Sequence, residues 1–201
     1  MNTLYENERL FVVPFDWSVI NNGNYCKWWN DQEVTKHNSH GLFPMSDYKL
    51  QQFMKQLDEY PDSQLVWAVF AKVSPKVIVI TPEGDKGDIP SKSIHIGNIS
   101  LQKIDLINRS AEFACVFGEK DYWGKGYCSQ AAAFLFDHGF DKLGLNRIWT
   151  GTAATNKGMM RVAEKLGMAE EGRFTEGVFL NGEFVDVIAF GVTAEMWEAA
   201  E

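Results

Sequence analysis

The chain has 201 residues, of which 45% are hydrophobic, and this combination predicts one folded domain with a sizeable core and excludes a disordered chain. The formal net charge is −8 and Lys and Arg form no cluster, which argues against a nucleic-acid binder and weakly favours cationic partners such as amines. No apolar stretch approaches membrane-spanning length and residues 1–15 lack a signal pattern, so we expect no membrane partner.

The cysteine content indicates the redox environment. Cys26, Cys115 and Cys128 are an odd number without the spacing of a disulfide framework or a metal site. We therefore expect free thiols that pack as small hydrophobic groups in a reducing cytoplasm.

The first half of the chain contains five segments with the period of a strand or a helix: a strand at 9–15, a helical or mixed segment at 21–38, a helix between Ser46 and Pro61, and strands at 65–73 and 94–104. Ser46 is placed to cap the helix, and Gly97 predicts a bulge in the last strand. Residues 74–93 are rich in Pro and Gly and predict a hairpin extension or surface insertion within a single domain of residues 1–201.

Two histidines, His37 and His40, lie in the polar turn that ends the helical segment. They are interpreted either as part of a solvated loop or as contacts to a substrate. No third ligand stands at metal spacing, so we expect no metal cofactor.

Residues 113–140 carry the most informative pattern. A short apolar run, Phe113 to Phe117, is followed by a polar turn, the Gly124-Lys125-Gly126 sequence and a helical period. The first N–H groups of a helix lack intrahelical partners and carry partial positive charge, and the glycines let an anion approach the backbone. A phosphate or pyrophosphate is the expected ligand, and a turn with glycines for geometry alone is the alternative.

Two common phosphate loops do not fit this turn. Gly118 and Gly124 are separated by five residues, where a P-loop has four residues between its first Gly and the Gly-Lys pair. Ser129 stands where a dinucleotide-binding fingerprint has its third glycine.

The second half of the chain continues the alternation with a strand at 147–152, a helix at 157–166, and strands at 171–180 and 183–192. Asn156 precedes the helix, and Asn181-Gly182 is a strong hairpin signal between the last two strands. The whole order predicts an α/β fold with a mixed, strand-rich sheet and helices on its faces.

The stretch Tyr122-Trp123-Gly124-Lys125-Gly126-Tyr127 resembles the acetyl-CoA loop of the GNAT superfamily of N-acetyltransferases, particularly its ribosomal-protein and amino-sugar branch. The stretch NKGMMRVAEKLGM, which begins at Asn156, resembles the Asn-led second motif of that family. The resemblance implies a mostly antiparallel sheet of seven strands, splayed between the fourth and fifth, with helices on both faces.

The resemblance also implies acetyl-CoA as co-substrate. The residues that it assigns to the cofactor are the fourth strand, the loop and the head of the second motif: Cys115, Val116, Phe117, Tyr122, Trp123, Gly124, Lys125, Gly126, Tyr127 and Asn156. Trp29, Asp31, Glu33 and Val34 fit a family run after which a loop covers the acceptor site.

Acetyl transfer to an amine needs a base or a water chain, because the amine attacks in its neutral form. Glu112, at the start of the central strand, resembles the base position of several GNAT enzymes, with a structural salt bridge as the alternative. Asp186 is the second candidate, because an acid within an apolar strand is costly unless it is paired or functional. The positions where the family carries Tyr or Ser as general acid are Ala163 and Met159, so the acid is not identified.

We therefore expect an N-acetyltransferase that moves acetyl from acetyl-CoA to a primary amine, by direct attack in a ternary complex. The acceptor is an amino sugar, a small amine or a protein N-terminus, and Arg173 and Glu176 either select it or form a surface ion pair. The alternative is a catalytically weak acyl-CoA-binding protein. The sequence does not decide the oligomeric state, and a homodimer is one of the states it allows.

Overall fold

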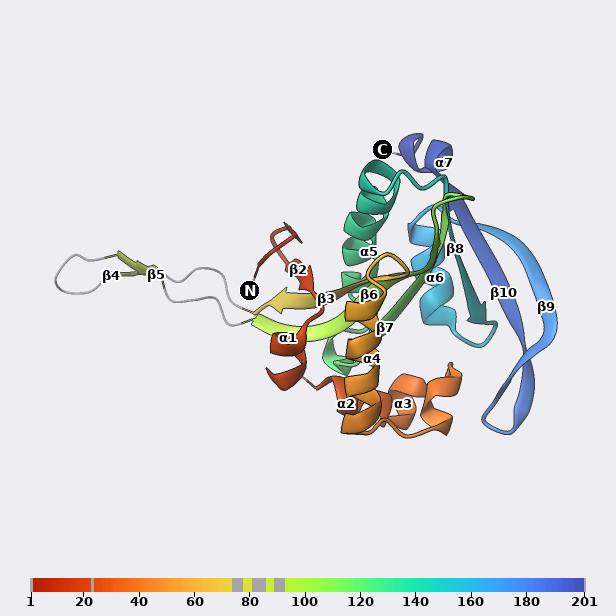
Figure 1. Ribbon diagram of the computed structural model, residues 1–201, viewed down its shortest axis with the longest axis horizontal. Helices are drawn as coiled ribbons and strands as arrows, with labels where there is room; N and C mark the ends of the chain where they lie inside the picture. The colour runs from red at the N-terminus through yellow and green to blue at the C-terminus, as the bar shows by residue number, and fades with distance from the viewer. Residues whose placement is uncertain (1, 23, 74–77, 81–85, 89–92, 201) are drawn as a thin grey trace.

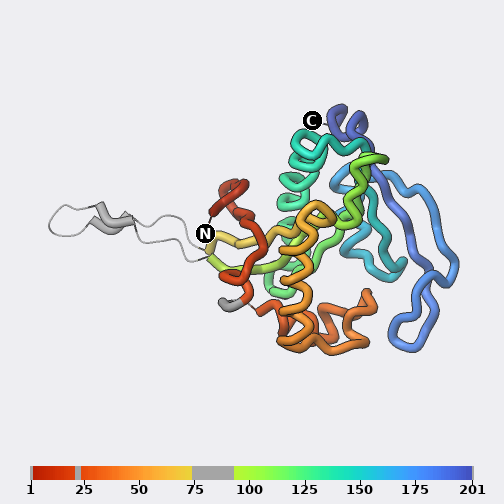
Figure 2. Tube along the Cα trace, viewed as in Figure 1, coloured from red at the N-terminus to blue at the C-terminus, as the bar shows by residue number. Residues whose placement is uncertain are grey.

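The computed structural model describes residues 2–22, 24–73, 78–80, 86–88 and 93–200. Within these residues, eight strands form one sheet in the order β1-β2-β3-β6-β7-β8-β10-β9 (Figure 1). The strands are β1 (Tyr5–Glu6), β2 (Leu10–Pro14), β3 (Leu65–Lys72), β6 (Ser93–Asp105), β7 (Ser110–Phe117), β8 (Arg147–Ala153), β9 (Ala169–Leu180) and β10 (Glu183–Thr193). The order nearly follows the chain, and in Figure 2 the colour passes from red and yellow at one end of the sheet to blue at the other.

The mixed α/β fold with a mostly antiparallel sheet is confirmed, but the predicted count of seven strands is wrong. The eighth strand, β1, has two residues and pairs with β2 through Tyr5↔Val12 and Glu6↔Phe11. A strand this short has no readable period, because alternation needs about four residues to show.

The predicted insertion at 74–93 falls largely outside the described residues. The described parts are β4 (Ile78–Ile80) and β5 (Lys86–Asp88), which pair antiparallel in a separate two-stranded sheet. That residues 1–201 form a single domain stays a prediction.

Helices cover both faces of the sheet. Buried side chains of α5 (Tyr127–Asp137) and α6 (Lys157–Lys165) pack on one face, and those of α4 (Asp47–Glu59) pack on the other. Trp67 and Val69 of β3 belong to the first cluster, whereas Ala68 and Phe70 belong to the second. This alternation is the period of two that a strand buried on both faces requires.

The predicted helical segment at 21–38 contains two short helices, α2 (Tyr25–Trp29) and α3 (Gln32–Thr35), and overlaps the end of a third, α1 (Trp17–Asn22). A new helix, α3, begins after Asp31, whose side chain accepts a hydrogen bond from the Glu33 N–H and caps α3. Such caps compete with helix continuation and divide the segment. Ser46 caps α4 as predicted, through the Lys49 N–H.

The sheet parts between β7 and β8, which are its one parallel pair among the described strands. Their pairing covers Ser110↔Arg147, Ala111↔Ile148 and Glu112↔Trp149, and then stops. Both strands continue past this point, β7 to Phe117 and β8 to Ala153. The predicted separation of the fourth and fifth strands is therefore confirmed.

Candidate active site

The glycine turn lies at the end of β7 and leads into α5. A short 3-10 helix, Lys120–Tyr122, precedes it, and Gly124 and Gly126 adopt positive φ angles of 70° and 84°. Gly126 is the N-terminal cap of α5 and supplies no side-chain hydrogen bond to the first turn. A Cβ added at Gly124 would meet no atom of the described residues within 4 Å, so backbone conformation, not crowding, requires glycine there.

Arg9 brings a second positive charge to the turn. Its Nη2 donates to the Lys125 carbonyl oxygen over 3.0 Å, and its guanidinium lies 4.4 Å from the centre of the Tyr127 ring. Arg9, the Lys125 side chain and the start of α5 together make this surface attractive to an anion. Arg9 has no local signal in the sequence, because it lies 116 positions from Lys125 and no short pattern joins the two residues.

The free edge of β7 faces the region between the parted strands. Gly118 donates its N–H to Ile96 O of β6 over 3.1 Å, and peptide groups alternate in direction along a strand. The peptide groups of Cys115 and Phe117 therefore point away from β6, whereas those of Val116 point toward it. The Phe117 carbonyl oxygen accepts a 2.7 Å hydrogen bond from Trp123 Nε1, which ties the strand end to the glycine turn.

Glu112 lies at the last paired position of β7, where the two strands part. Its Oε2 forms an ion pair with Lys103 Nζ over 2.7 Å, and the Glu112 side chain is 21% exposed. The Lys103 ammonium also lies 5.3 Å from the centre of the Trp149 ring, across the parallel pair. The salt bridge that was the alternative interpretation of Glu112 is therefore present. It lies where β7 and β8 stop pairing.

Asp186 is bound on both carboxylate oxygens. Oδ2 accepts from Arg173 Nε at 2.5 Å, and Oδ1 accepts the Glu176 N–H at 2.7 Å. The Glu176 N–H, followed by the Arg173 guanidinium, lowers the pKa of the carboxyl group below its ordinary value. The register of β9 and β10 shifts at this point, so Asp186 stabilises an irregular part of the hairpin. Of the two predicted acceptor contacts, Arg173 is held in this ion pair and Glu176 contributes its backbone.

We expect Asp186→Asn to destabilise the hairpin at neutral pH. A carboxylate with a lowered folded-state pKa contributes stability above its unfolded value, ordinarily 3.8, and loses that contribution as pH falls through the folded value. The gap in melting temperature between variant and unmodified protein should therefore close as pH falls through and below 3.8. Melting curves across that range measure it, and a constant gap would contradict the assignment.

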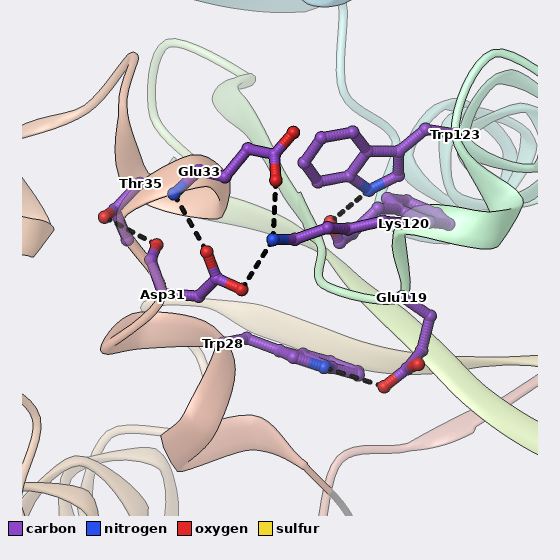
Figure 3. A network of polar contacts seen from close by, with 8 residues as sticks. Trp28, Asp31, Glu33, Thr35, Glu119, Lys120 and Trp123 are labelled. Atoms are coloured by element: carbon purple, nitrogen blue, oxygen red, sulfur yellow. Dashed lines mark hydrogen bonds and ion pairs between the residues drawn. The ribbon is translucent and has the colours of Figure 1, made fainter.

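Asp31 and Glu33, from the predicted family run, hold Lys120. Figure 3 shows the Lys120 ammonium between the two carboxylates, at 2.9 Å from Asp31 Oδ2 and 2.6 Å from Glu33 Oε2. Beside it, Trp28 Nε1 donates to Glu119 Oε1 over 3.0 Å. These contacts fasten α2 and α3 to the segment that leads into the glycine turn, a role that the sequence run alone did not indicate.

His37 and His40 lie in the loop segment that follows α3, in which Ser39–Leu42 form the short 3-10 helix η1. His37 Nδ1 is 3.3 Å from Thr155 Oγ1, immediately before Asn156, and burial lowers the pKa of the His37 imidazole. The His40 ring packs 4.4 Å from the Trp29 ring, centre to centre. The loop therefore meets the start of the second motif.

The tip of the β9–β10 hairpin also meets this loop, because Asn181 Nδ2 donates to Lys36 O over 3.0 Å. Asn156 itself caps α6, with its Oδ1 accepting from the Met159 N–H at 3.1 Å. The helix cap is thus present, whether or not the amide also contacts a cofactor.

Neither a metal cluster nor a membrane span is found in the part of the chain that the structure describes. There, no three His, Cys, Asp or Glu side chains are grouped so as to hold a metal ion. No helix in that part is long and apolar enough to cross a bilayer.

A mixed sheet that parts beside a glycine turn and a helix N-terminus is the arrangement expected of an acyltransferase that uses an acyl-CoA. Residues 9–169 match the family model described as an acetyltransferase (GNAT) domain. The chain therefore belongs to the GNAT acetyltransferase family, whose members are acyltransferases.

Relatives agree with this membership. The chain is 28% identical over 194 residues to the uncharacterized N-acetyltransferase p20 of Bacillus licheniformis, and the match covers 96% of each protein. It is 33% identical over 102 residues to YdaF of Bacillus subtilis (strain 168), whose name suggests a ribosomal N-acetyltransferase. That match covers 51% of this chain and about half, 55%, of YdaF.

A solved structure shows the same fold. The spermidine N-acetyltransferase from Vibrio cholerae, in complex with CoA and spermine, superimposes with a TM-score of 0.73 at 20% identity, over 96% of this chain and 99% of that one.

Proposed function

We propose that the protein is an acetyl-CoA-dependent N-acetyltransferase that moves the acetyl group from the thioester to a primary amine. The observation that carries the proposal is the glycine turn, with Gly124 and Gly126 at positive φ, directly beside the unpaired edge of β7. The helix N-terminus, Lys125 and Arg9 offer positive charge to a pyrophosphate, and the edge of β7 offers peptide groups to an amide-containing arm. The residues present fit the cofactor that the family implies.

Acetyl-CoA would supply the activated acyl group, and the chain's residues would position the reactants. The backbone of Cys115 and Phe117 would hold the arm along β7, and the turn from Trp123 to Tyr127 would hold the pyrophosphate. Holding the amine and the thioester together can supply much of the rate without a covalent enzyme intermediate. Glu112, at the parting of the strands, is the proposed acceptor of the amine proton, directly or through water.

The two usual positions of a general acid offer no proton donor to the leaving thiolate. Ala163 is fully buried, and Met159 Sδ lies 3.7 Å from the Cys115 thiol. Either another group protonates the thiolate, or the thiolate leaves without assistance. The same observation favours the second candidate function, an acyl-CoA-binding protein with weak catalysis.

Three acceptor classes follow from this reasoning and from the relatives: small polyamines, protein N-termini and amino sugars. The net charge of −8 favours a cationic acceptor. A ribosomal protein is the acceptor that the name of YdaF suggests, and spermine accompanies CoA in the structural neighbour.

The decisive experiment is acetyl-CoA turnover on an amine panel. CoA release is measured with spermidine, amino-sugar nucleotides, amino acids and N-terminal peptides, and acetyl-CoA binding is measured by calorimetry on the same protein. Turnover with one class supports the enzyme. Binding without turnover supports the weak acyl-CoA binder, and no binding contradicts both.

Arg9→Gln should weaken acetyl-CoA binding without a matching loss of stability. Arg9 is exposed, so its removal changes folding little, whereas an anion beside Lys125 loses a charge-assisted partner. Calorimetry with CoA and with 3′-dephospho-CoA shows which phosphate is involved. Arg161→Gln is the control, because it removes one positive charge from α6, and equal effects of both variants would contradict a specific contact.

Asn156 is proposed to position the pantetheine amide in addition to capping α6. Asn156→Ala removes the cap and should cost about 1 kcal/mol of stability. Asn156→Ser keeps an oxygen that can cap the helix but lacks the amide. The variant should therefore retain the melting temperature, while its apparent Michaelis constant for acetyl-CoA rises. If the Ser variant binds acetyl-CoA as the unmodified protein does, Asn156 is a helix cap alone.

A further inference from the structure

Two thiols are in contact beneath the glycine turn. Cys115 of β7 and Cys128 in the first turn of α5 are both free, and their Sγ atoms lie 3.4 Å apart. Met159 Sδ of α6 lies 3.7 Å from Cys115 Sγ on the other side. Three sulfur atoms therefore meet where β7, α5 and α6 converge, and the acetyl-transfer reaction proposed above uses none of them.

We propose that Cys115 and Cys128 form a redox-active dithiol that a small disulfide compound oxidises to an intramolecular disulfide. A disulfide bond is about 2.0 Å long, so the two sulfur atoms must approach by about 1.4 Å from their present separation. Side-chain rotation and a small displacement of β7 toward α5 supply this approach. No further residue has to move out of the way between them, because the thiols already touch.

The reaction balances as two thiol–disulfide exchanges. One protein thiolate attacks a sulfur of the small disulfide, which forms a mixed disulfide and releases one small thiol. The second protein thiolate then attacks the protein sulfur of the mixed disulfide and releases the other small thiol. The two cysteines lose two protons and two electrons, and the small disulfide is reduced to two thiols.

The hydrogen bond between the thiols indicates the order in which they react. Cys128 donates to Cys115 Sγ, and this hydrogen bond together with burial raises the pKa of the Cys128 thiol well above its ordinary value. A thiol with a raised pKa is a weak nucleophile, because the thiolate is the attacking form. Cys115 is therefore the attacking sulfur, and Cys128 resolves the mixed disulfide.

Oxidation would act on the cofactor site through the backbone. The disulfide closes the segment from 115 to 128, which contains both Gly124 and Gly126. It also pulls on Cys115, whose peptide group faces the parted strands. We expect weaker acetyl-CoA binding in the oxidised protein, a consequence that rests on the proposed function, whereas the formation of the disulfide does not.

Cys26 is an internal control. It packs against the cluster on the α4 face of the sheet, whereas Cys115 packs against the cluster on the α5 face. Its thiol contacts the Asp47 carboxylate at 3.8 Å, and burial raises its pKa. The sheet therefore separates Cys26 from the pair, and it has no thiol partner among the described residues.

The test treats the purified full chain with oxidised glutathione and maps the thiols by mass spectrometry. We expect a protein about 2 Da lighter, with Cys115 and Cys128 joined and Cys26 free, and dithiothreitol should reverse the change. Cys128→Ser should stop at the glutathione adduct on Cys115, and Cys26→Ser should behave as the unmodified protein does. Disulfides between chains, or modification confined to Cys26, would overturn the dithiol.

Acetyl-CoA affinity of the reduced and the oxidised protein, measured by calorimetry, tests the consequence. We expect a several-fold loss on oxidation that dithiothreitol restores. A mapped disulfide with unchanged affinity would overturn the link to the cofactor site. If even the reduced protein does not bind acetyl-CoA, the proposed function fails, and the thiol map still decides the dithiol.

Discussion

Gly126→Ala should reduce the affinity for acetyl-CoA about tenfold, the change that about 1.4 kcal/mol produces. Gly126 has a φ of 84°, which costs an L-residue about 1–2 kcal/mol, and the alanine can relieve that strain by leaving the present turn. Its methyl group would also occupy space beside the first turn of α5, where the nearest side-chain atom, Gln130 Nε2, is 3.8 Å away. Both effects act on the surface that the pyrophosphate would approach.

Gly182→Ala is a matched control for this variant. Gly182 has a φ of 89° in the β9–β10 turn, and a Cβ there would meet no atom within 4 Å among the residues that the structure describes. The two variants therefore impose similar backbone strain and should lower the melting temperature by similar amounts. Calorimetry should find the loss of affinity in Gly126→Ala alone. An equal loss in both would show that strain anywhere in the fold weakens binding, and would contradict a specific role of the turn.

Glu112→Gln should lower turnover by about 10²–10⁴, the range of general base catalysis, and leave acetyl-CoA affinity nearly unchanged. The variant keeps the size of the side chain and removes the proton acceptor. The loss should be largest at low pH and shrink as pH rises, because a growing fraction of the acceptor amine is then already neutral. Initial rates over a pH series, with saturating acetyl-CoA, measure this.

Lys103→Met separates catalysis from the ion pair. It removes the partner of Glu112 and leaves the carboxylate in place, and the Lys103 side chain is 69% exposed, so the pair is worth at most about 1 kcal/mol of stability. A purely structural Glu112 predicts that both variants lose the same small stability and keep full turnover.

Asp186→Asn distinguishes the rival base. Because both oxygens of Asp186 are already engaged by Arg173 and the Glu176 N–H, we expect a loss of hairpin stability with turnover retained in the folded protein. If the folded Asp186→Asn protein is inactive and Glu112→Gln is active, the role of base moves to Asp186. If neither matters, solvent deprotonates the amine and the protein works by positioning.

Patterns within a short stretch of sequence predicted most of the fold. The strand, glycine turn and helix of residues 113–140 are recovered because each depends on neighbours in the chain, namely the apolar period, the positive φ of two glycines and the unpaired N–H groups of a helix start. The parting of β7 from β8 came from the family resemblance and not from any residue period.

Contacts between distant segments could not be predicted in this way. Lys120 is 87 positions from Glu33, and Arg9 is 116 positions from Lys125, so neither pair has a local signature. The same limit applies to Cys115 and Cys128, whose spacing of 13 gave no sign that strand and helix would bring the sulfur atoms together. Tertiary packing, which a single sequence does not display, decides these contacts.

The pairing between β7 and β8, called the seam here, is short and leaves backbone groups of both strands unpaired in the middle of the sheet. Three residue pairs join a five-stranded leaf, β1-β2-β3-β6-β7, to a three-stranded leaf, β8-β10-β9. Beyond the seam, β8 offers no pairing to the amides of Cys115 and Phe117, so these hydrogens should exchange with solvent faster than the amides that face β6. A bound pantetheine chain, which has amides of its own, would take the place of a missing strand and form hydrogen bonds between the two leaves. The proposed co-substrate would then also be a structural member of the sheet while it is bound. Its release would leave the two leaves joined by the three residue pairs and by the buried core that both share.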